Sequence, residues 1–145
     1  MSLRSACLLI IIPLFFLSGC EKKEGRKFRI SFSQCTGGDA WRRDMLRGMQ
    51  RELAFHPNVQ FEYHDAKGSS QTQIAQIKQI ILDKPDLLIV SPNEAVPITP
   101  VVEEAYQKGI PVVVVDRKTA SSFYTAYVGG NNYEVGKTAG AYIGD

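Results

Sequence analysis

The sequence predicts an α/β fold, an open parallel β-sheet with helices on both of its faces. Segments of strand length alternate along the chain with longer segments whose apolar residues recur at helical spacing. Two of the short segments, at 87–90 and 112–115, are apolar throughout. Strands of this kind, alternating with helices, are typical of a parallel sheet that is covered on both sides.

The first strand is expected at 28–34 (FRISFSQ) and the second at 59–65 (VQFEYHD), because apolar and polar residues alternate in both. Between them, residues 39–55 carry apolar side chains four apart on one stripe, which predicts a helix. The residues His-Pro-Asn at 56–58 break that helix before the second strand begins.

A second helix is expected at 70–82, where isoleucines share one face and Pro85 follows the last turn. The apolar strand at 87–90 comes next. A third helix is expected at 99–108, because Gly109 follows it at the position where helix ends favour glycine.

The last predicted elements are a strand at 112–115 (VVVV), a weaker strand at 125–128 and a helix at 132–143. The four valines run directly into Asp116 and Arg117. In open α/β sheets, ligands bind outside the carboxyl ends of the strands. The charged pair therefore stands where a ligand would meet it.

The composition is that of an ordinary globular protein with one packed core. The chain has 145 residues, of which 44% are hydrophobic and 22% charged, and its formal net charge is +2 at pH 7. Neither the charge nor its distribution favours a nucleic-acid partner or a basic membrane-binding patch.

The first twenty residues, MSLRSACLLIIIPLFFLSGC, have the pattern of an export signal. One early arginine precedes an apolar run that is too short to span a membrane comfortably. The ending Leu-Ser-Gly-Cys resembles a bacterial lipobox, in which lipid is attached to the cysteine before cleavage. We therefore expect a lipoprotein signal peptide at 1–19, lipidation of Cys20 and a charged tether at 20–27. A plain secretory signal is the alternative.

The sequence contains three cysteines. Cys7 would leave with the signal peptide and Cys20 would carry lipid, so only Cys35 is left and no intramolecular disulfide is expected. Cys35 is either a small buried hydrophobic residue or a nucleophile. The two histidines, His56 and His64, are not its neighbours in the sequence, which favours the buried role.

Three strand ends bring polar groups to the predicted carboxyl edge. The segment after the first strand offers an acid, a base and a tryptophan at the start of a helix. The segments after the third and fourth strands add a hydroxyl, an amide and a second acid–base pair. The candidate ligand-binding residues are Asp39, Trp41, Arg42, Ser91, Asn93, Asp116 and Arg117.

This set of groups suits a sugar. Each sugar hydroxyl is both a donor and an acceptor, and it can donate to a carboxylate and accept from a guanidinium group. The indole of Trp41 offers a flat apolar surface to the C–H face of a sugar ring.

Each candidate also has a structural alternative. Asp39 could cap the N-terminus of its helix, which the two preceding glycines would allow. Trp41 could belong to the core, Arg42 to a solvated helix face, and the pair at 116–117 to a surface ion pair. Asn93 follows Ser-Pro and could serve turn formation instead of ligand contact.

Other chemistries find less support. The segment TGGDAWRR lacks the third glycine of a dinucleotide-binding motif, and the sequence has no P-loop, HExxH or GxSxG motif. We expect no cofactor and no bound metal. An exported α/β enzyme that uses Asp39 and Asp116 as acid and base is a second class, but two nearby arginines would hold both carboxylates ionised.

The strand ends resemble those of the type I periplasmic binding proteins for sugars, which include the ribose- and galactose-binding proteins. VVVVDRK is similar to the segment in which an Asp-Arg pair of that family contacts the sugar, and DAWRR matches its polar and aromatic cluster after the first strand. Ser91 stands where transport proteins of the group usually carry asparagine. The segments most similar to the periplasmic sensor domain of hybrid two-component histidine kinases are SQC, DAWRR, LLIVSPNEA, PVVEEAYQKGIPVVVVDRKT and YTAYVGGNNYEVG.

The resemblance implies a flavodoxin-like strand order and an incomplete N-terminal lobe, at 28–145, of a two-lobed domain. It implies a carbohydrate-binding domain in the periplasm, held at the membrane, that binds a monosaccharide or small sugar and has no catalytic activity of its own. The first expectation is a sugar sensor, followed by a membrane helix and a histidine kinase module. The alternative is the substrate-binding lipoprotein of a sugar ABC transporter, whose partner is a permease.

Overall fold

The computed structural model describes residues 25–144. The predicted signal peptide and Cys20 lie outside these residues. Five parallel strands form one sheet in the order β2-β1-β3-β4-β5. The strands are β1 (Phe28–Gln34), β2 (Val59–Asp65), β3 (Leu87–Ser91), β4 (Val112–Val115) and β5 (Ala126–Val128). The predicted open parallel sheet and its flavodoxin-like order are confirmed.

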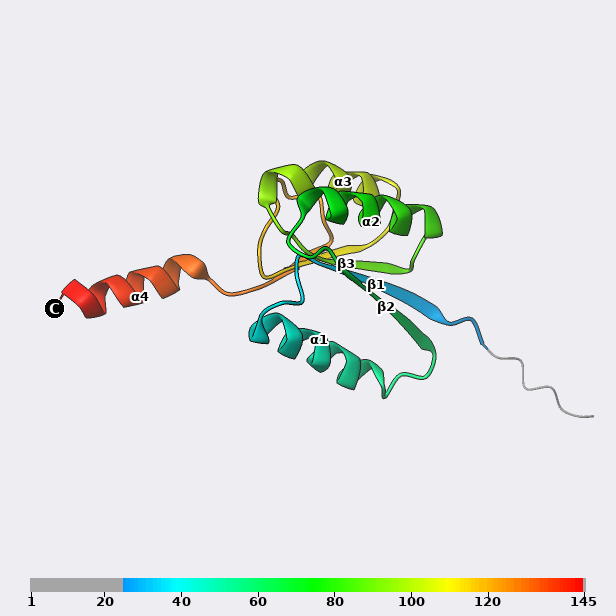
Figure 1. Ribbon diagram of the computed structural model, residues 1–145, viewed down its shortest axis with the longest axis horizontal. Coiled ribbons are helices and arrows are strands. Elements are labelled where there is room, and N and C mark those ends of the chain that lie inside the picture. Colours follow the sequence, from blue (N-terminus) through cyan, green and yellow to red (C-terminus); the bar gives the residue numbers. More distant parts are fainter. Residues whose placement is uncertain (1–24, 145) are drawn as a thin grey trace, which may run out of the picture.

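Four helices accompany the sheet in the described part of the chain. They are α1 (Ala40–Leu53), α2 (Ser70–Asp83), α3 (Ala95–Gln107) and α4 (Asn132–Gly144). α2 and α3 lie together on one face, α1 lies on the opposite face, and α4 projects away from the sheet (Figure 1). The prediction of helices on both faces is therefore confirmed.

The start of α3 differs from the prediction. The helix begins at Ala95 and not at residue 99, so it also includes Pro97, whereas Pro100 already lay within the predicted range. Pro97 falls in the first turn, where a backbone N–H has no partner within the helix, and proline is tolerated there. The end agrees with the prediction, because Gly109 follows the helix with a φ of +79°, a conformation that glycine adopts without strain.

The hydrophobic core lies between the sheet and the layer of α2 and α3. Leu88 and Val90 of β3 stand in register with Val112 and Val114 of β4, and all four are fully buried. They share one cluster with Ile77, Ile80, Ile81, Ile98, Val101, Val102, Ala105 and Ile110. Each large side chain buried in this way contributes about 1.5–3 kcal/mol, so the core holds the strand ends in place.

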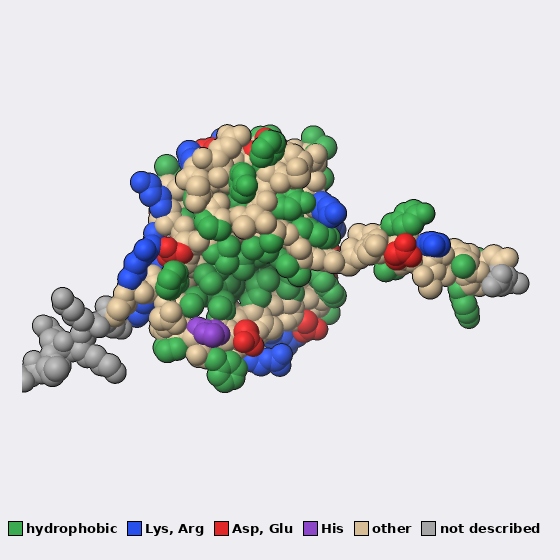
Figure 2. Space-filling view, turned by 180° about the vertical axis from the view of Figure 1, so that it is seen from behind, with side chains coloured by type: hydrophobic (Ala, Val, Ile, Leu, Met, Phe, Trp, Pro, Cys, Tyr) green, Lys and Arg blue, Asp and Glu red, His purple; other side chains and the backbone are tan. Residues whose placement is uncertain are grey.

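The face of the sheet toward α1 is less completely covered. α1 has no buried residue. Ile89 and Val113, which are paired across β3 and β4, are only partly buried, and Val128 at the end of β5 is 62% exposed. Figure 2 shows hydrophobic side chains gathered at the centre of the rear of the molecule.

No helix within residues 25–144 has both the length and the apolar character needed to cross a membrane.

Candidate ligand-binding site

Arg42 lies at the centre of the candidate site, in the first turn of α1. Its Nη1 donates to Asp39 Oδ2 at 2.7 Å and its Nη2 donates to Asp116 Oδ2 at 3.0 Å. Its Nε donates to the sulfur of Cys35 at 3.0 Å. Only 12% of the Arg42 side chain is exposed. One guanidinium group therefore joins the end of β1, the end of β4 and the start of α1.

Asp39 is both the N-cap of α1 and a member of this cluster. Its Oδ1 accepts a hydrogen bond from the backbone N–H of Arg42 at 2.9 Å. That backbone hydrogen bond, followed by the one from the guanidinium group, lowers the pKa of the Asp39 carboxyl below its usual value. Burial is the largest single influence on Arg42 and disfavours its charged form, but the interactions with Asp39 and Cys35 together outweigh it, so the pKa of Arg42 is raised.

Asp116 follows β4 in the left-handed backbone region, with a φ of +66°. A non-glycine residue pays about 1–3 kcal/mol for such a conformation, so it persists only where neighbours hold it. The amide of Asp116 donates to the carbonyl of Val128 at 2.9 Å. Arg117 does not pair with Asp116, because its Nη1 donates to the carbonyl of Asn93 at 2.7 Å. The ion pair of Asp116 is made with Arg42 instead.

Trp41 and Ser91 differ in how a ligand can reach them. Trp41 is 55% exposed, so it is not a core residue, and its ring centroid lies 5.7 Å from the guanidinium carbon of Arg42. Ser91 is fully buried, with its hydroxyl 3.9 Å from the sulfur of Cys35. Cys35 is a buried free thiol. The indole is therefore accessible at the surface, whereas the serine lies beneath the edge of the sheet.

Asn93 is bound within the protein itself. Its side-chain amide donates to Ser70 Oγ at 3.0 Å and to the carbonyl of Gly68 at 3.2 Å. Its backbone N–H donates to Oε1 of Gln73 at 2.8 Å. Gln73 is fully buried and also donates to the carbonyl of Ser91 at 2.9 Å. These bonds fix the loop after β3, which supports the structural role of Asn93.

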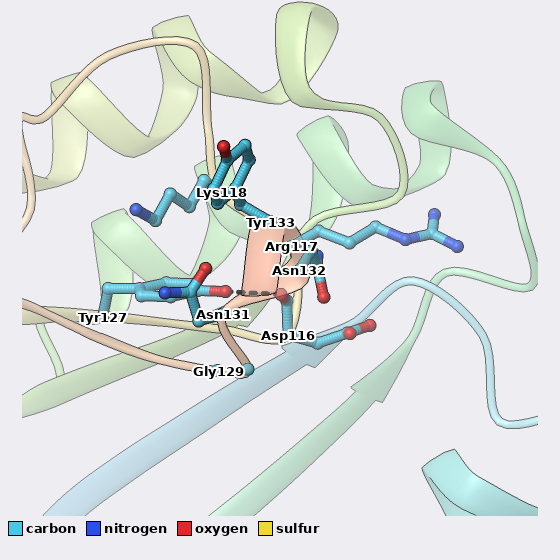
Figure 3. Close-up of a pocket in the computed structure, with 9 residues that line it drawn as sticks. Asp116, Arg117, Lys118, Tyr127, Gly129, Asn131, Asn132 and Tyr133 are labelled. Atoms are coloured by element: carbon cyan, nitrogen blue, oxygen red, sulfur yellow. Dashed lines mark hydrogen bonds between the residues drawn. The ribbon is translucent and has the colours of Figure 1, made fainter. Parts of the chain in front are cut away.

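A pocket of about 660 Å³ opens beside the cluster and includes residues that the sequence analysis did not select. It lies between the loop after β4 and the segment at 129–131, and its lining includes Asp116, Arg117, Lys118, Tyr127, Gly129 and Tyr133. In Figure 3 the side chains of Asp116 and Arg117 extend away from Tyr127, whereas the side chain of Lys118 lies on the same side of the loop as the Tyr127 ring. The additional lining residues could have been found from their position in the sequence, because they come directly after β4 or lie around the end of β5.

The cluster suits the binding of a hydroxylated molecule better than acid–base catalysis. Within the described residues, Oδ1 of Asp116 accepts no hydrogen bond, so it is open to a hydroxyl donor. Asp39 has a lowered pKa, which leaves it without a proton to donate near neutral pH. Residues 25–144 contain no group of three or more His, Cys, Asp or Glu residues placed to hold a metal ion.

The parallel sheet and the polar cluster at its carboxyl edge define a class: α/β domains that meet a small solute at their strand ends. The chain belongs to the periplasmic binding protein domain family, whose profile matches residues 30–145. The family expected from the sequence is therefore confirmed, and membership indicates a periplasmic location.

The relatives are named as sugar-binding proteins. The chain is similar to the fructose-binding periplasmic domain of a hybrid two-component system, with 47% identity, a TM-score of 0.77 and coverage of 80% of this chain and 38% of that one. It is 25% identical to the ribose import binding protein of Bacillus subtilis (strain 168), over 98% of this chain and 50% of the relative. It is 26% identical to the D-xylose-binding periplasmic protein of Haemophilus influenzae, over 94% of this chain and 40% of the relative. The chain thus spans half or less of the length of these relatives.

Proposed function

We propose that residues 28–145 form one lobe of a periplasmic sugar-binding domain, with the carboxyl edge of the sheet as its ligand-facing surface. The observation that carries this proposal is the bridge from Asp39 through Arg42 to Asp116, beside the exposed Trp41. It offers carboxylate acceptors, guanidinium donors and an aromatic plane within one cluster, which together match a sugar's hydroxyls and C–H face.

The opposite side of the site is proposed to come from a second lobe of the same protein. Small-ligand sites in proteins bury about 70–90% of the ligand surface, which an open edge does not achieve by itself. Two observations support a second lobe: the relatives are at least twice as long as the match, and α4 has no buried residue. A sugar held between two lobes would favour the closed arrangement.

The test is a calorimetric titration of the full-length protein with D-fructose, D-ribose and D-xylose, the sugars named for its relatives. We expect micromolar or tighter binding of at least one sugar and no binding of an amino acid such as leucine. A folded protein that binds none of a broad panel of pentoses and hexoses would contradict the proposal.

We propose a sensory role first and a transport role second. The sensory role is favoured by the 47% identity to a domain of a hybrid two-component system. The transport role is favoured by the likeness to the ribose import binding protein, although that identity is 25%. The reading frame beyond residue 145 distinguishes them. A membrane helix and a kinase histidine motif would support the sensor, and a stop codon after a second lobe would support the transport protein.

We also propose a lipid anchor at Cys20, which rests on the sequence Leu-Ser-Gly-Cys. A labelled fatty acid should enter the wild-type protein and not the Cys20→Ala variant, which should be either uncleaved or soluble. Incorporation of label into both proteins, or into neither, would contradict the anchor and leave the sugar site unaffected.

A further inference from the structure

Tyr127 contacts the ligand-facing turn from the neighbouring strand. It is the middle residue of β5 and is partly buried. Its hydroxyl donates to the carbonyl of Asp116 at 2.8 Å, as Figure 3 shows. The amide of the same residue, Asp116, donates to Val128. Both backbone polar groups of a residue with a φ of +66° are therefore bound to β5.

The same tyrosine lies against the segment that leaves the sheet. A Cβ added to Gly129 would collide with the hydroxyl of Tyr127 and would lie 2.5 Å from its Cζ. Among the described glycines, only Gly68 and Gly109 have a positive φ. Gly129 therefore has a backbone conformation that other residues can adopt. The tyrosine, and not the backbone conformation, therefore opposes a side chain at position 129, and alanine there would force the ring of Tyr127 to move.

Lys118 holds the ring from the loop after β4. Its ammonium nitrogen lies 4.8 Å from the centroid of the Tyr127 ring. A cation over an aromatic face at this distance is attracted by the ring quadrupole. The tyrosine therefore contacts the turn at 116–118 through the hydrogen bond of its hydroxyl and the cation–π contact of its ring, and its hydroxyl end lies close to Gly129.

We propose that Tyr127 is a positioning residue that fixes the Asp116 turn relative to the segment at 129–131 and thereby sets the sugar affinity of the site. The inference rests on the proposed sugar-binding function. The hydrogen bond to the Asp116 carbonyl orients the peptide group between residues 116 and 117. That peptide group joins the Cα atoms of Asp116 and Arg117, so a change in its orientation would redirect the carboxylate of Asp116 and the guanidinium group of Arg117 together.

The first arm of the test uses the Tyr127→Phe variant of the full-length protein. The variant keeps the ring and deletes the hydroxyl. Without sugar, amide hydrogen exchange at residues 116–118 should rise about threefold or more, because the turn loses one hydrogen bond. Sugar affinity should fall about three- to tenfold, the equivalent of one neutral hydrogen bond. Tyr124→Phe is the matched control, because the Tyr124 ring packs against the core and its hydroxyl makes no hydrogen bond within the described residues.

The second arm is a double-mutant cycle with Gly129→Ala. In the wild-type background, the added methyl group should displace the tyrosine and weaken sugar binding by at least the factor seen for Tyr127→Phe. In a Tyr127→Ala background, Gly129→Ala should cause no further loss, because the collision has been removed. Such non-additivity is expected only for residues that act through one contact.

The outcomes separate this inference from the proposed function. If the wild-type protein binds no sugar, the proposed function fails, and the exchange measurement still decides whether Tyr127 holds the turn. Unchanged exchange at 116–118 in Tyr127→Phe would overturn the positioning role. Increased exchange with unchanged sugar affinity would overturn the link to binding, as would equal losses for Tyr124→Phe or additive effects in the cycle.

Discussion

At the scale of single residues, the site depends on the shape of one side chain. A guanidinium group presents its donors in a rigid planar fork, whereas an ammonium group is a compact point charge on a flexible stem. Arg42 uses this fork to reach Asp39, Asp116 and Cys35 from one position. Lysine at this position has the same charge but lacks the geometry for all three contacts.

The substitution Arg42→Lys should therefore lower the free energy of unfolding by about 1.5–3 kcal/mol, the range for a hydrogen bond to a charged group. Arg43→Lys is the matched control, because Arg43 is exposed and should change stability by less than about 0.5 kcal/mol. Urea denaturation of both variants measures the difference. Equal effects of the two substitutions would show that the bridge of Arg42 adds nothing to stability.

At the scale of elements, the N-terminus of α1 couples folding to pH. The pKa of Asp39 is lowered in the folded protein, first by the backbone hydrogen bond from Arg42 and then by the guanidinium group. A carboxyl with a lowered pKa stabilises the folded state above its unfolded pKa of about 3.9, and this stabilisation is lost as the pH falls through the folded pKa. The carboxylate form should therefore support α1 across the neutral range.

The pH dependence of Asp39→Asn tests this coupling, because asparagine keeps the capping oxygen but carries no charge. The difference in melting temperature between wild type and variant should stay constant from pH 7 to about pH 5 and shrink below about pH 4. A difference that already disappears near pH 6, or that persists undiminished at pH 2, would contradict the coupling.

The elements were more predictable from the sequence than the contacts between them. Periodicity and the all-valine strand indicated the order of strands and helices, because burial on one or both faces dictates those patterns. The start of α3 at Ala95 was missed, because the predicted range of 99–108 rested on the glycine at its C-terminal end and no residue at 95–98 marked the beginning. The burial of Gln73 could have been predicted, because this residue lies four positions before Ile77 on the buried stripe of α2.

The bridge at the carboxyl edge could be predicted only in part. The strand ends placed Asp39, Arg42 and Asp116 at one edge of the sheet. Their pairing was not predictable, because Arg42 and Asp116 are 74 residues apart and side-chain reach depends on the packed helix. Tyr127 was missed for the same reason, since its role depends on how β5 lies beside the turn after β4.

At the scale of the whole molecule, the described residues present only one side of a binding site. The carboxyl edge is open, α4 has no buried residue, and the face toward α1 retains exposed apolar surface at Val128. A piece spanning residues 21–145 should therefore bind sugar only weakly, with a dissociation constant well above micromolar, because one edge cannot enclose the ligand. Calorimetry on that piece measures it, and micromolar binding would contradict the two-lobed account.

The central claim is that the carboxyl edge holds the sugar, and Asp116→Asn tests it most directly. Asparagine has the same shape and tolerates the left-handed conformation that Asp116 adopts, so the fold should survive. The measurement is a sugar titration of the full-length protein, wild type against variant, with thermal unfolding as the control. We expect a loss of about 1.5–3 kcal/mol of binding free energy, the value of a hydrogen bond to a charged group, in a protein that still unfolds cooperatively although its ion pair with Arg42 is weakened. Unchanged sugar affinity in a folded Asp116→Asn protein would contradict it.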